Sequence, residues 1–409
     1  MIEQTLGKKY SQFVNILIFI FPIAINSVKV AGDIVLFILA MMGIFITISQ
    51  KLSPFIIKEI KVFSYLTTGY FLAVCLSVLF SGKATELAHF IPRDFYFLFA
   101  PFIALALYKS EINVNYLLAG VKVGLIVLGI IIGNQFLSGV HRPSGVMNSI
   151  EFGTLAVSMF FIVLIFLHKE SLKYKIFTLL SLLSGFFIIV ESGSRSAWVS
   201  LIILTGLCLY FFYKQKTKSN RVSIIVVLVI FTSVLSAFNF NQYVNDRVHL
   251  AYTQTSNWFE GDRAVNSVSQ RLEMYKIAID NVKDVPFFGH GLRTSNIVLF
   301  EEAQSNFKHY ITRYNHLHNA YLTNFYNGGI PLLGALLLLL FVPLRIFVKA
   351  IRKNRDEPVF AAGALLTLGF ASHGMFSSLF GGVFMNAFYV FFLVIFLLLT
   401  NKSKTVIGA

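Results

Sequence analysis

Long runs of hydrophobic residues, separated by short polar segments, make up most of this chain. A helix needs about 20 apolar residues to cross the hydrocarbon core of a bilayer. The pattern predicts about twelve such helices; eleven or thirteen stay open, because the fourth run is short and barely a turn separates the first two. The predicted spans are 12–29, 31–50, 62–80, 94–108, 117–137, 150–168, 174–191, 195–213, 222–240, 319–347, 359–379 and 383–400.

One long polar segment interrupts this pattern and divides the chain into three parts. Residues 1–240 hold nine predicted helices, 241–318 form a large loop, and 319–409 hold three helices and a short polar tail. Within the loop, the segment from Ser267 to Gln270 has the form of a capping box. The helix that follows is expected to place one apolar face against the membrane domain and to end before Pro286. That face consists of Val268, Leu272, Tyr275, Ile279 and Val282.

The composition is that of a protein whose solvent is lipid. Apolar residues make up 56% of the chain and charged residues 13%, and the mean hydropathy is +0.73, whereas soluble proteins carry about 25% charged residues. Cys75 and Cys208 both lie inside apolar runs, which argues against a disulfide framework and against a cysteine metal site. The first apolar run lacks a cleavage pattern, so we expect it to be retained as a span.

The positive charge of the chain reports its orientation in the membrane. A net charge of +15 would suit a nucleic-acid partner, but the charges fall in short clusters between the apolar runs. If the N-terminus is cytoplasmic, the inner segments hold roughly four times as many Lys and Arg as the short outer loops, as the positive-inside rule requires. The distribution therefore predicts cytoplasmic termini and a large loop on the non-cytoplasmic side, and it accounts for most of the positive charge as a topology signal and not as a nucleic-acid footprint.

Arginine residues on the outer side need a separate explanation. Arg93, Arg142 and Arg195 lie there, and the planar guanidinium group suits phosphate oxygens. Arg195 begins a span, where a charge is costly unless it is paired or solvated; snorkelling to lipid headgroups or pairing with Glu191 is the alternative. Arg271 lies on the predicted loop helix, where a solvated helix face is the alternative.

The sharpest local signal precedes the tenth predicted span, where His316 and His318 are followed by Asn319. A metal site is the weaker reading, because no cysteine or close carboxylate accompanies the pair. If His318 lies in the first turn of the span, the helix dipole and nearby arginines disfavour its charged form. A neutral imidazole can act as a general base; a structural histidine is the alternative. With several arginines, such a site suits an anionic lipid-linked headgroup and, for a sugar pyrophosphate, glycan transfer without a metal or other cofactor.

These residues resemble the O-antigen ligase family, membrane glycosyltransferases that move a glycan from undecaprenyl pyrophosphate to lipid A–core. The resemblance covers the length of the chain, the span count and the large loop. The local matches are Gly193 to Ala197, Asn266 to Tyr275, and His316 to Asn319. The broader motif is His-Asn, nine residues, Gly, two residues, then Gly, Thr or Tyr. This chain departs from it only at Leu332, which weakens any assignment to a subfamily.

The resemblance implies an all-α, GT-C-like polytopic membrane fold with its active site on the periplasmic face of the bacterial inner membrane. It implies pyrophosphate binding by Arg195 and Arg271, with Arg93 and Arg142 as further contacts. His318 would activate the acceptor hydroxyl, supported by His316 and Asn319.

Other activities stay open. An O-antigen polymerase would use a second lipid-linked repeat as acceptor. A protein O-oligosaccharyltransferase is less expected, because the chain stops soon after its last span. A transporter of anionic lipids would need charges along a pathway, and only Asp33 and Lys122 lie well inside spans.

Overall fold

The structure is a computed structural model that describes residues 2–80, 92–140, 142–214, 232, 242–262, 264–294, 298–299, 307–309 and 314–407. Within these residues every regular element is helical, which confirms the predicted all-α fold. The helices of the membrane-spanning part are α1 (Ile2–Ser27), α2 (Ala31–Gln50), α3 (Lys58–Phe80), α5 (Phe95–Tyr108), α6 (Val114–Leu137), α7 (Ser149–Phe166), α8 (Leu172–Glu191), α9 (Arg195–Lys214), α15 (Ala320–Lys353), α16 (Pro358–Gly374) and α17 (Val383–Ile407).

The loop helices are α11 (Gln242–Phe259) and α12 (Ser269–Asp280). Short 3-10 turns are η2 (Pro92–Asp94), η3 (Leu167–Lys169) and η4 (Val282–Asp284).

Eleven of the twelve predicted spans overlap a helix of the structure. Among the described residues, nine helices are long and apolar enough to cross a membrane. The other two, α5 and α16, have 14 and 17 residues, and at 1.5 Å per residue α5 is only about 21 Å long. Of the twelfth predicted span, 222–240, only Thr232 is described. The polytopic fold is confirmed, and the count of twelve stays a prediction.

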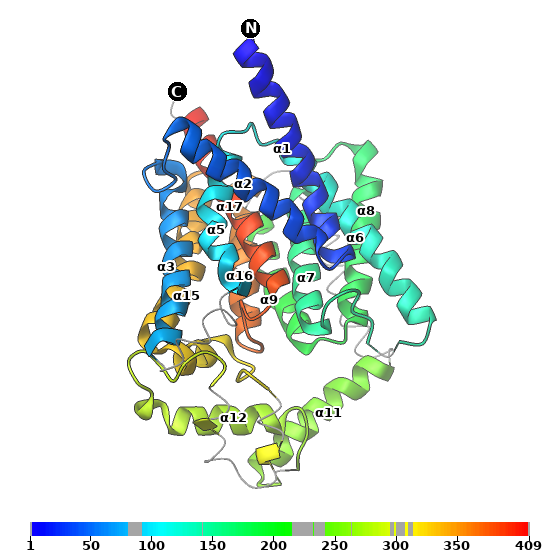
Figure 1. Cartoon of the computed structure of the whole chain (residues 1–409). Helices are drawn as coiled ribbons and strands as arrows, with labels where there is room; N and C mark the ends of the chain where they lie inside the picture. The colour runs from blue at the N-terminus through cyan, green and yellow to red at the C-terminus, as the bar shows by residue number, and fades with distance from the viewer. Residues whose placement is uncertain are drawn as a thin grey trace.

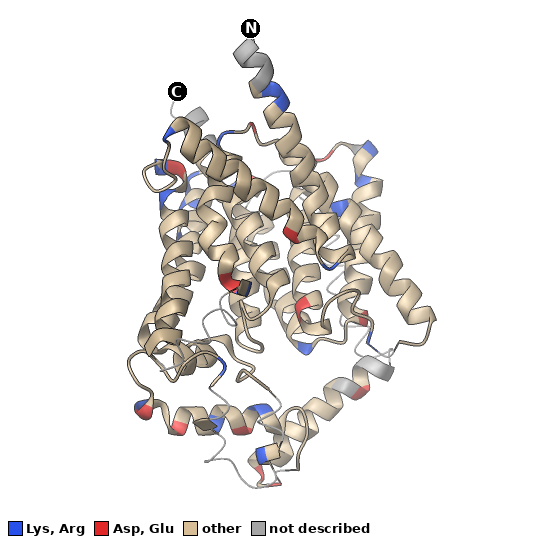
Figure 2. Ribbon diagram, in the orientation of Figure 1, with Lys and Arg blue, Asp and Glu red and all other residues tan. Residues whose placement is uncertain are grey.

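The helices form a bundle with a separate layer across one end (Figure 1). Helix α7 is the most enclosed of the long spans, with 89% of its apolar window buried, and α17 follows with 83%. Helices α11 and α12 lie across the end of the bundle that is opposite to the early turns of α1 and the last turns of α17 (Figure 1). Charged residues gather near the two ends and are sparse in between (Figure 2), as expected where lipid surrounds the middle of the bundle.

The capping box of α12 lies one residue earlier than predicted. Asn266 Oδ1 accepts from the backbone N–H of Ser269 at 2.9 Å, and Ser269 Oγ accepts from the N–H of Asn266 at 2.9 Å. The reciprocal pair is therefore Asn266 with Ser269, and the prediction of Ser267 with Gln270 is wrong. Asn is as good a cap as Ser, so spacing alone did not distinguish the two positions.

The predicted buried face of α12 is also wrong at two of its five positions. Ile279 and Val282 are exposed, whereas Met274, Ile277 and Ala278 are buried. These three pack in a small core of the loop itself, together with Leu317 and other residues from the segment before α15 and with Tyr326 of α15; its members also include Leu299 and Phe307. The helix therefore buries its apolar face mainly within the loop layer, which the sequence pattern did not reveal.

A kink in α15 ties the loop layer to the bundle. Gly329 has φ 62° and ψ −153° inside the helix, a conformation essentially restricted to glycine. The kink leaves backbone groups of α15 without partners inside the helix, and the segment after η4 forms hydrogen bonds with them. His290 N–H donates to Tyr326 O at 2.8 Å, Gly291 N–H donates to Asn327 O at 2.9 Å, and Ile330 N–H donates to Phe287 O at 3.1 Å. The glycine of the predicted motif therefore docks the 286–294 segment onto α15.

Candidate active site

Two neighbouring cavities lie at the loop end of the bundle. The larger, here called the chamber, has a volume of about 360 Å³, and residues of η2, α3, α7, α15 and the 377–381 segment line it together with Arg293, His316 and His318. The smaller, here called the arginine cavity, has a volume of about 100 Å³ and is lined by Arg142, Ile150, Gly193, Ser194, Arg195, Ser196, Ser267 and Arg271. Ile150 lines both cavities, so they share a wall.

A tight turn between α8 and α9 places Arg195 in the arginine cavity. Gly193 has φ +57°, the left-handed conformation that commonly ends a helix, and α9 begins two residues later. The indole N–H of Trp198 donates to Ile189 O at 3.1 Å and holds the two helices together across the turn. Arg195 therefore occupies the first position of α9, where the N-terminal amides also favour an anion.

Arg142 and Arg271 reach the same cavity from separate segments. Arg142 precedes α7, and its Nη2 lies 3.5 Å from the carbonyl oxygens of Ser192 and Gly193. Arg271 lies in the first turn of α12, and burial lowers its pKa while Tyr275 and Tyr314 raise it. Three guanidinium groups from sequence-distant segments thus converge on one small volume, and such a concentration of positive charge favours a multiply charged anion.

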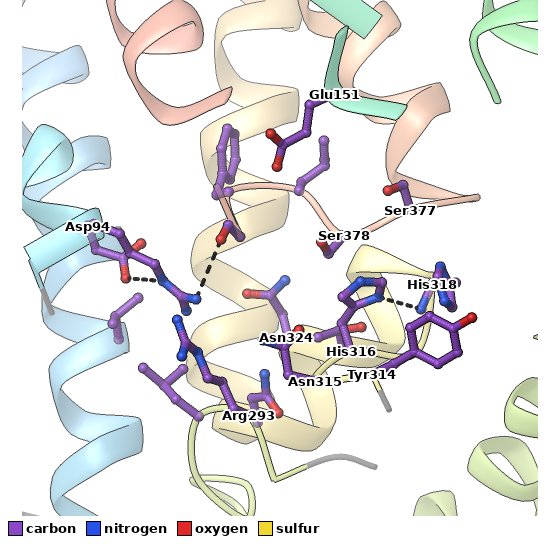
Figure 3. A pocket seen from close by; sticks show the side chains of 18 of the residues that line it. Asp94, Glu151, Arg293, Tyr314, Asn315, His316, His318, Asn324, Ser377 and Ser378 are labelled. Atoms are coloured by element: carbon purple, nitrogen blue, oxygen red, sulfur yellow. Dashed lines mark hydrogen bonds and ion pairs between the residues drawn. The ribbon is translucent and has the colours of Figure 1, made fainter. Parts of the chain in front are cut away.

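The two histidines lie together in the chamber. Their ring centroids are 4.4 Å apart, and the ring of Tyr314 lies 4.5 Å from that of His318. The backbone N–H of His318 donates to Nδ1 of His316 at 3.1 Å, which requires an unprotonated nitrogen there. Nδ1 of His318 is buried and has no hydrogen-bond partner among the described residues. Figure 3 shows both rings with Tyr314 on one side of the chamber.

The environment of the histidines keeps both imidazoles neutral. Burial lowers the pKa of His316 to about 4, with Arg271 acting in the same direction. Burial also lowers the pKa of His318 to about 2, with further contributions from His316 and Arg271. The action of Arg271 on both rings shows that the arginine cavity and the histidines are electrostatically coupled.

His318 is held in an uncommon backbone conformation just before α15. Its φ is +52°, and its carbonyl oxygen accepts from the Tyr275 hydroxyl of α12 at 2.7 Å. The condition of a place in the first turn of the span is not met, because Asn319 is the N-cap and α15 begins at Ala320. Burial and neighbouring groups, not a place inside the helix, therefore account for the neutral ring.

Asn319 contributes to the structure around the histidines and does not line either cavity. Its Oδ1 accepts from the N–H groups of Tyr321 and Leu322 at 3.0 and 3.1 Å. Its amide nitrogen donates to Met375 O at 3.3 Å. Asn319 thus fixes the start of α15, and with it the position of His318.

Arg93 lies apart from the other predicted arginines. It lines the chamber and not the arginine cavity. Its Nε donates to Asp94 Oδ2 at 3.2 Å, and its Nη1 lies 3.5 Å from Gly381 O. Burial lowers the pKa of the neighbouring Arg293, Arg93 lowers that pKa further, and Asp94 raises it. Figure 3 shows Asp94 and Arg293 on the side of the chamber away from His316 and His318.

Several chamber residues were missed by the sequence analysis: Arg293, Asp94, Glu151 and Tyr314. The one available signal was the pair of glycines just before Arg293, since Gly289 and Gly291 both have positive φ and mark a shaped turn. Within the described part of the chain, no group of three or more His, Cys, Asp or Glu side chains is placed to hold a metal ion.

Fold and site together define a multi-pass membrane protein with a cationic cavity beside a histidine-lined chamber at one end. A protein family described as O-antigen ligase matches this chain over residues 179–337. The predicted resemblance is thereby confirmed for that segment, which carries Arg195, Arg271 and His318; Arg93 and Arg142 lie outside it. Members of the family are membrane glycosyltransferase-like enzymes. The match therefore supports an enzyme of the O-antigen ligase or polymerase type, with lipid-linked polysaccharide substrates.

A relative in Haemophilus influenzae extends the similarity over most of the chain. It is 23% identical over 361 residues, which are 84% of this chain and 87% of the relative. That protein is described as uncharacterized, so it adds no activity to the comparison.

Proposed function

We propose that this chain transfers a glycan from undecaprenyl pyrophosphate to a sugar hydroxyl of lipid A–core. The reaction would take place at the periplasmic face of the bacterial inner membrane, with both termini of the chain in the cytoplasm. One observation carries the proposal. Three guanidinium groups line a cavity that shares Ile150 with the chamber holding His318. A pyrophosphate in the first cavity would present its sugar to the second.

Arg142, Arg195 and Arg271 would bind the donor pyrophosphate. As the bond between the anomeric carbon and the phosphate oxygen breaks, its electron pair leaves with undecaprenyl pyrophosphate. Guanidinium groups and the N-terminus of α9 would stabilise the negative charge that develops there. Because pyrophosphate is a good leaving group, no proton donor is required for it.

His318 would act as the general base. The acceptor hydroxyl attacks the anomeric carbon while its proton passes to the imidazole, and the configuration at that carbon is inverted. A base with a pKa of about 2 is weak at neutral pH, and general bases work best near the operating pH. Donor pyrophosphate beside Arg271 would offset the positive charge that acts on His318 and raise its pKa. The donor would thus activate the base, in a step without a metal.

The test is glycan transfer by the purified full-length protein. Undecaprenyl-pyrophosphate glycan is supplied with either lipid A–core or a second lipid-linked repeat, with and without EDTA. We expect transfer to lipid A–core, unaffected by EDTA, and loss of transfer for His318→Ala in protein that purifies in wild-type amounts. Transfer only to the second lipid-linked repeat would make the protein a polymerase instead.

A His318→Ala variant with wild-type transfer would remove His318 from the mechanism. Loss of transfer in EDTA that added metal restores would overturn the metal-independent step. The variant Lys276→Ala is the matched control, because this exposed residue of α12 pairs with Asp280 on the surface and lines neither cavity.

A further inference from the structure

A second pair of arginines lies across the chamber from the histidines. Arg93 belongs to η2, which precedes α5, and Arg293 belongs to the segment docked on α15. Asp94 is the carboxylate beside them, and only 1% of its surface is exposed. Among the residues that the structure describes on this wall, two guanidinium groups lie next to one buried carboxylate, which leaves a net positive charge there. Glu151 also lines the chamber, but Figure 3 shows it on the side away from Arg293.

The structure fixes both arginines in place. Arg93 is oriented by Asp94 and by Gly381 O, and its own carbonyl oxygen accepts from Asn386 Nδ2 at 2.9 Å. Arg293 has φ +59°, which is uncommon for a residue with a side chain and occurs where surrounding structure imposes it. The docking of Gly291 on Asn327 supplies that constraint two residues earlier. Such strain at a cavity wall is typical of binding sites.

The stereochemistry of the displacement indicates which of the two substrates lies against Arg93 and Arg293. In an inverting displacement the attacking hydroxyl approaches the anomeric carbon from the side opposite the leaving group. The leaving pyrophosphate lies in the arginine cavity under the proposed function, so the acceptor must occupy the part of the chamber farther from it. Arg93 and Arg293 line the chamber and do not line the arginine cavity.

We propose that Arg93 and Arg293 form an acceptor subsite that binds an anionic group of the acceptor saccharide, a phosphate or a carboxylate. This inference rests on the proposed function and names a property of the acceptor that the reaction itself does not require. Guanidinium groups bind both kinds of oxyanion through paired N–H donors. The subsite would position the acceptor hydroxyl toward His318 and would select acceptors that carry a negative charge near that hydroxyl.

The test compares Arg293→Gln with wild type by steady-state kinetics of the full-length protein. Acceptor and donor concentrations are varied separately, with lipid A–core as acceptor. Loss of a charge-assisted hydrogen bond corresponds to roughly a tenfold or larger weakening of binding. We therefore expect the acceptor KM to rise about tenfold or more, the donor KM to stay within about twofold, and Arg293→Lys to lie between Arg293→Gln and wild type. Lys283→Gln, an exposed cation of the same loop, should behave as wild type.

Modified acceptors identify the anion. One preparation of lipid A–core has its phosphates removed with hydrofluoric acid, another has its carboxylates reduced, and a third has undergone both treatments. On the preparation that lacks the recognised group, wild type should show the raised acceptor KM and Arg293→Gln should lose nothing further. Should Arg293→Gln fail to fold, the double variant Arg93→Gln with Asp94→Asn, which leaves no buried carboxylate unpaired, gives the same comparison.

An unchanged acceptor KM in Arg293→Gln would overturn the subsite. So would an equal rise in donor KM, or a penalty that persists on acceptors stripped of both anions. These outcomes leave transfer by the wild-type protein intact and so reject the subsite alone. Absence of transfer by wild type with any acceptor would reject the proposed function and the subsite with it.

Discussion

Gly329→Ala should release the 286–294 segment from α15. A Cβ at this position would lie 1.9 Å from Phe287 O, 2.5 Å from Phe287 C and 2.7 Å from Gly289 N. All three are backbone atoms, so no side chain can rotate to make room. The φ of 62° and ψ of −153° add a conformational cost of about 1–3 kcal/mol for a residue other than glycine.

The size of the effect follows from the contacts that hold the segment. Relief of the clash requires Phe287 to move away, which breaks its hydrogen bond with Ile330 and displaces the bonds of His290 and Gly291. At about 1 kcal/mol net for each bond, the docked state loses about 3 kcal/mol. A change of that size corresponds to about 100-fold in the equilibrium between docked and released states.

Hydrogen exchange in lipid nanodiscs measures this release directly. The amides of His290, Gly291 and Ile330 should exchange about 100-fold faster in Gly329→Ala, and transfer should fall because Arg293 is no longer held at the chamber wall. Gly334→Ala is the matched control, since a Cβ there meets nothing within 4 Å and alanine favours a helix. Wild-type protection of the three amides in Gly329→Ala would refute the docking role of the kink.

Three further predictions concern the arginines, the histidines and the cap of α15. Arg195→Lys and Arg271→Lys should each lower transfer by about tenfold or more despite retained charge, because the paired N–H donors are lost. Arg352→Lys, at an exposed position, is the control. Full activity in either active-site variant would mean that a point charge suffices at that position. Since the pKa of His316 is lowered to about 4 and that of His318 to about 2, the unfolded chain binds more protons than the folded chain at acid pH. Stability should therefore fall as the pH drops below about 6.5. If donor binding raises the pKa of His318, the acid limb of the pH profile of kcat should lie at higher pH than the acid limb of kcat/KM. Acid limbs at the same pH would contradict donor activation. Asn319→Ala should lower the thermal midpoint, because loss of the cap costs about 1 kcal/mol. Asn319→Asp keeps the accepting oxygen and loses only the bond to Met375 O, so it should lower the midpoint less; equal midpoints for the two variants would show that the cap contributes little.

The helices of the membrane domain were predictable because their signal is local. Each span needs its own run of apolar residues in order to satisfy its backbone groups in lipid, and eleven of the twelve predicted ranges overlap helices of the structure. The pattern failed for α12, where Ile279 was expected to be buried and is exposed. A loop helix can bury its apolar positions against several partners, and periodicity does not say which partner is present.

The sequence by itself determined a polytopic helical membrane protein, its large loop, and the residue types that suit a phosphate-bearing substrate. It did so because lipid solvation and guanidinium chemistry act through the identity of single residues and short runs. Only the tertiary structure decided how those residues are grouped. It separated Arg93 from Arg142, Arg195 and Arg271, placed Arg293 opposite the histidines, and gave Asn319 and Gly329 their roles in α15. Such groupings depend on contacts between segments that can be hundreds of residues apart in the sequence, and no local pattern specifies those contacts.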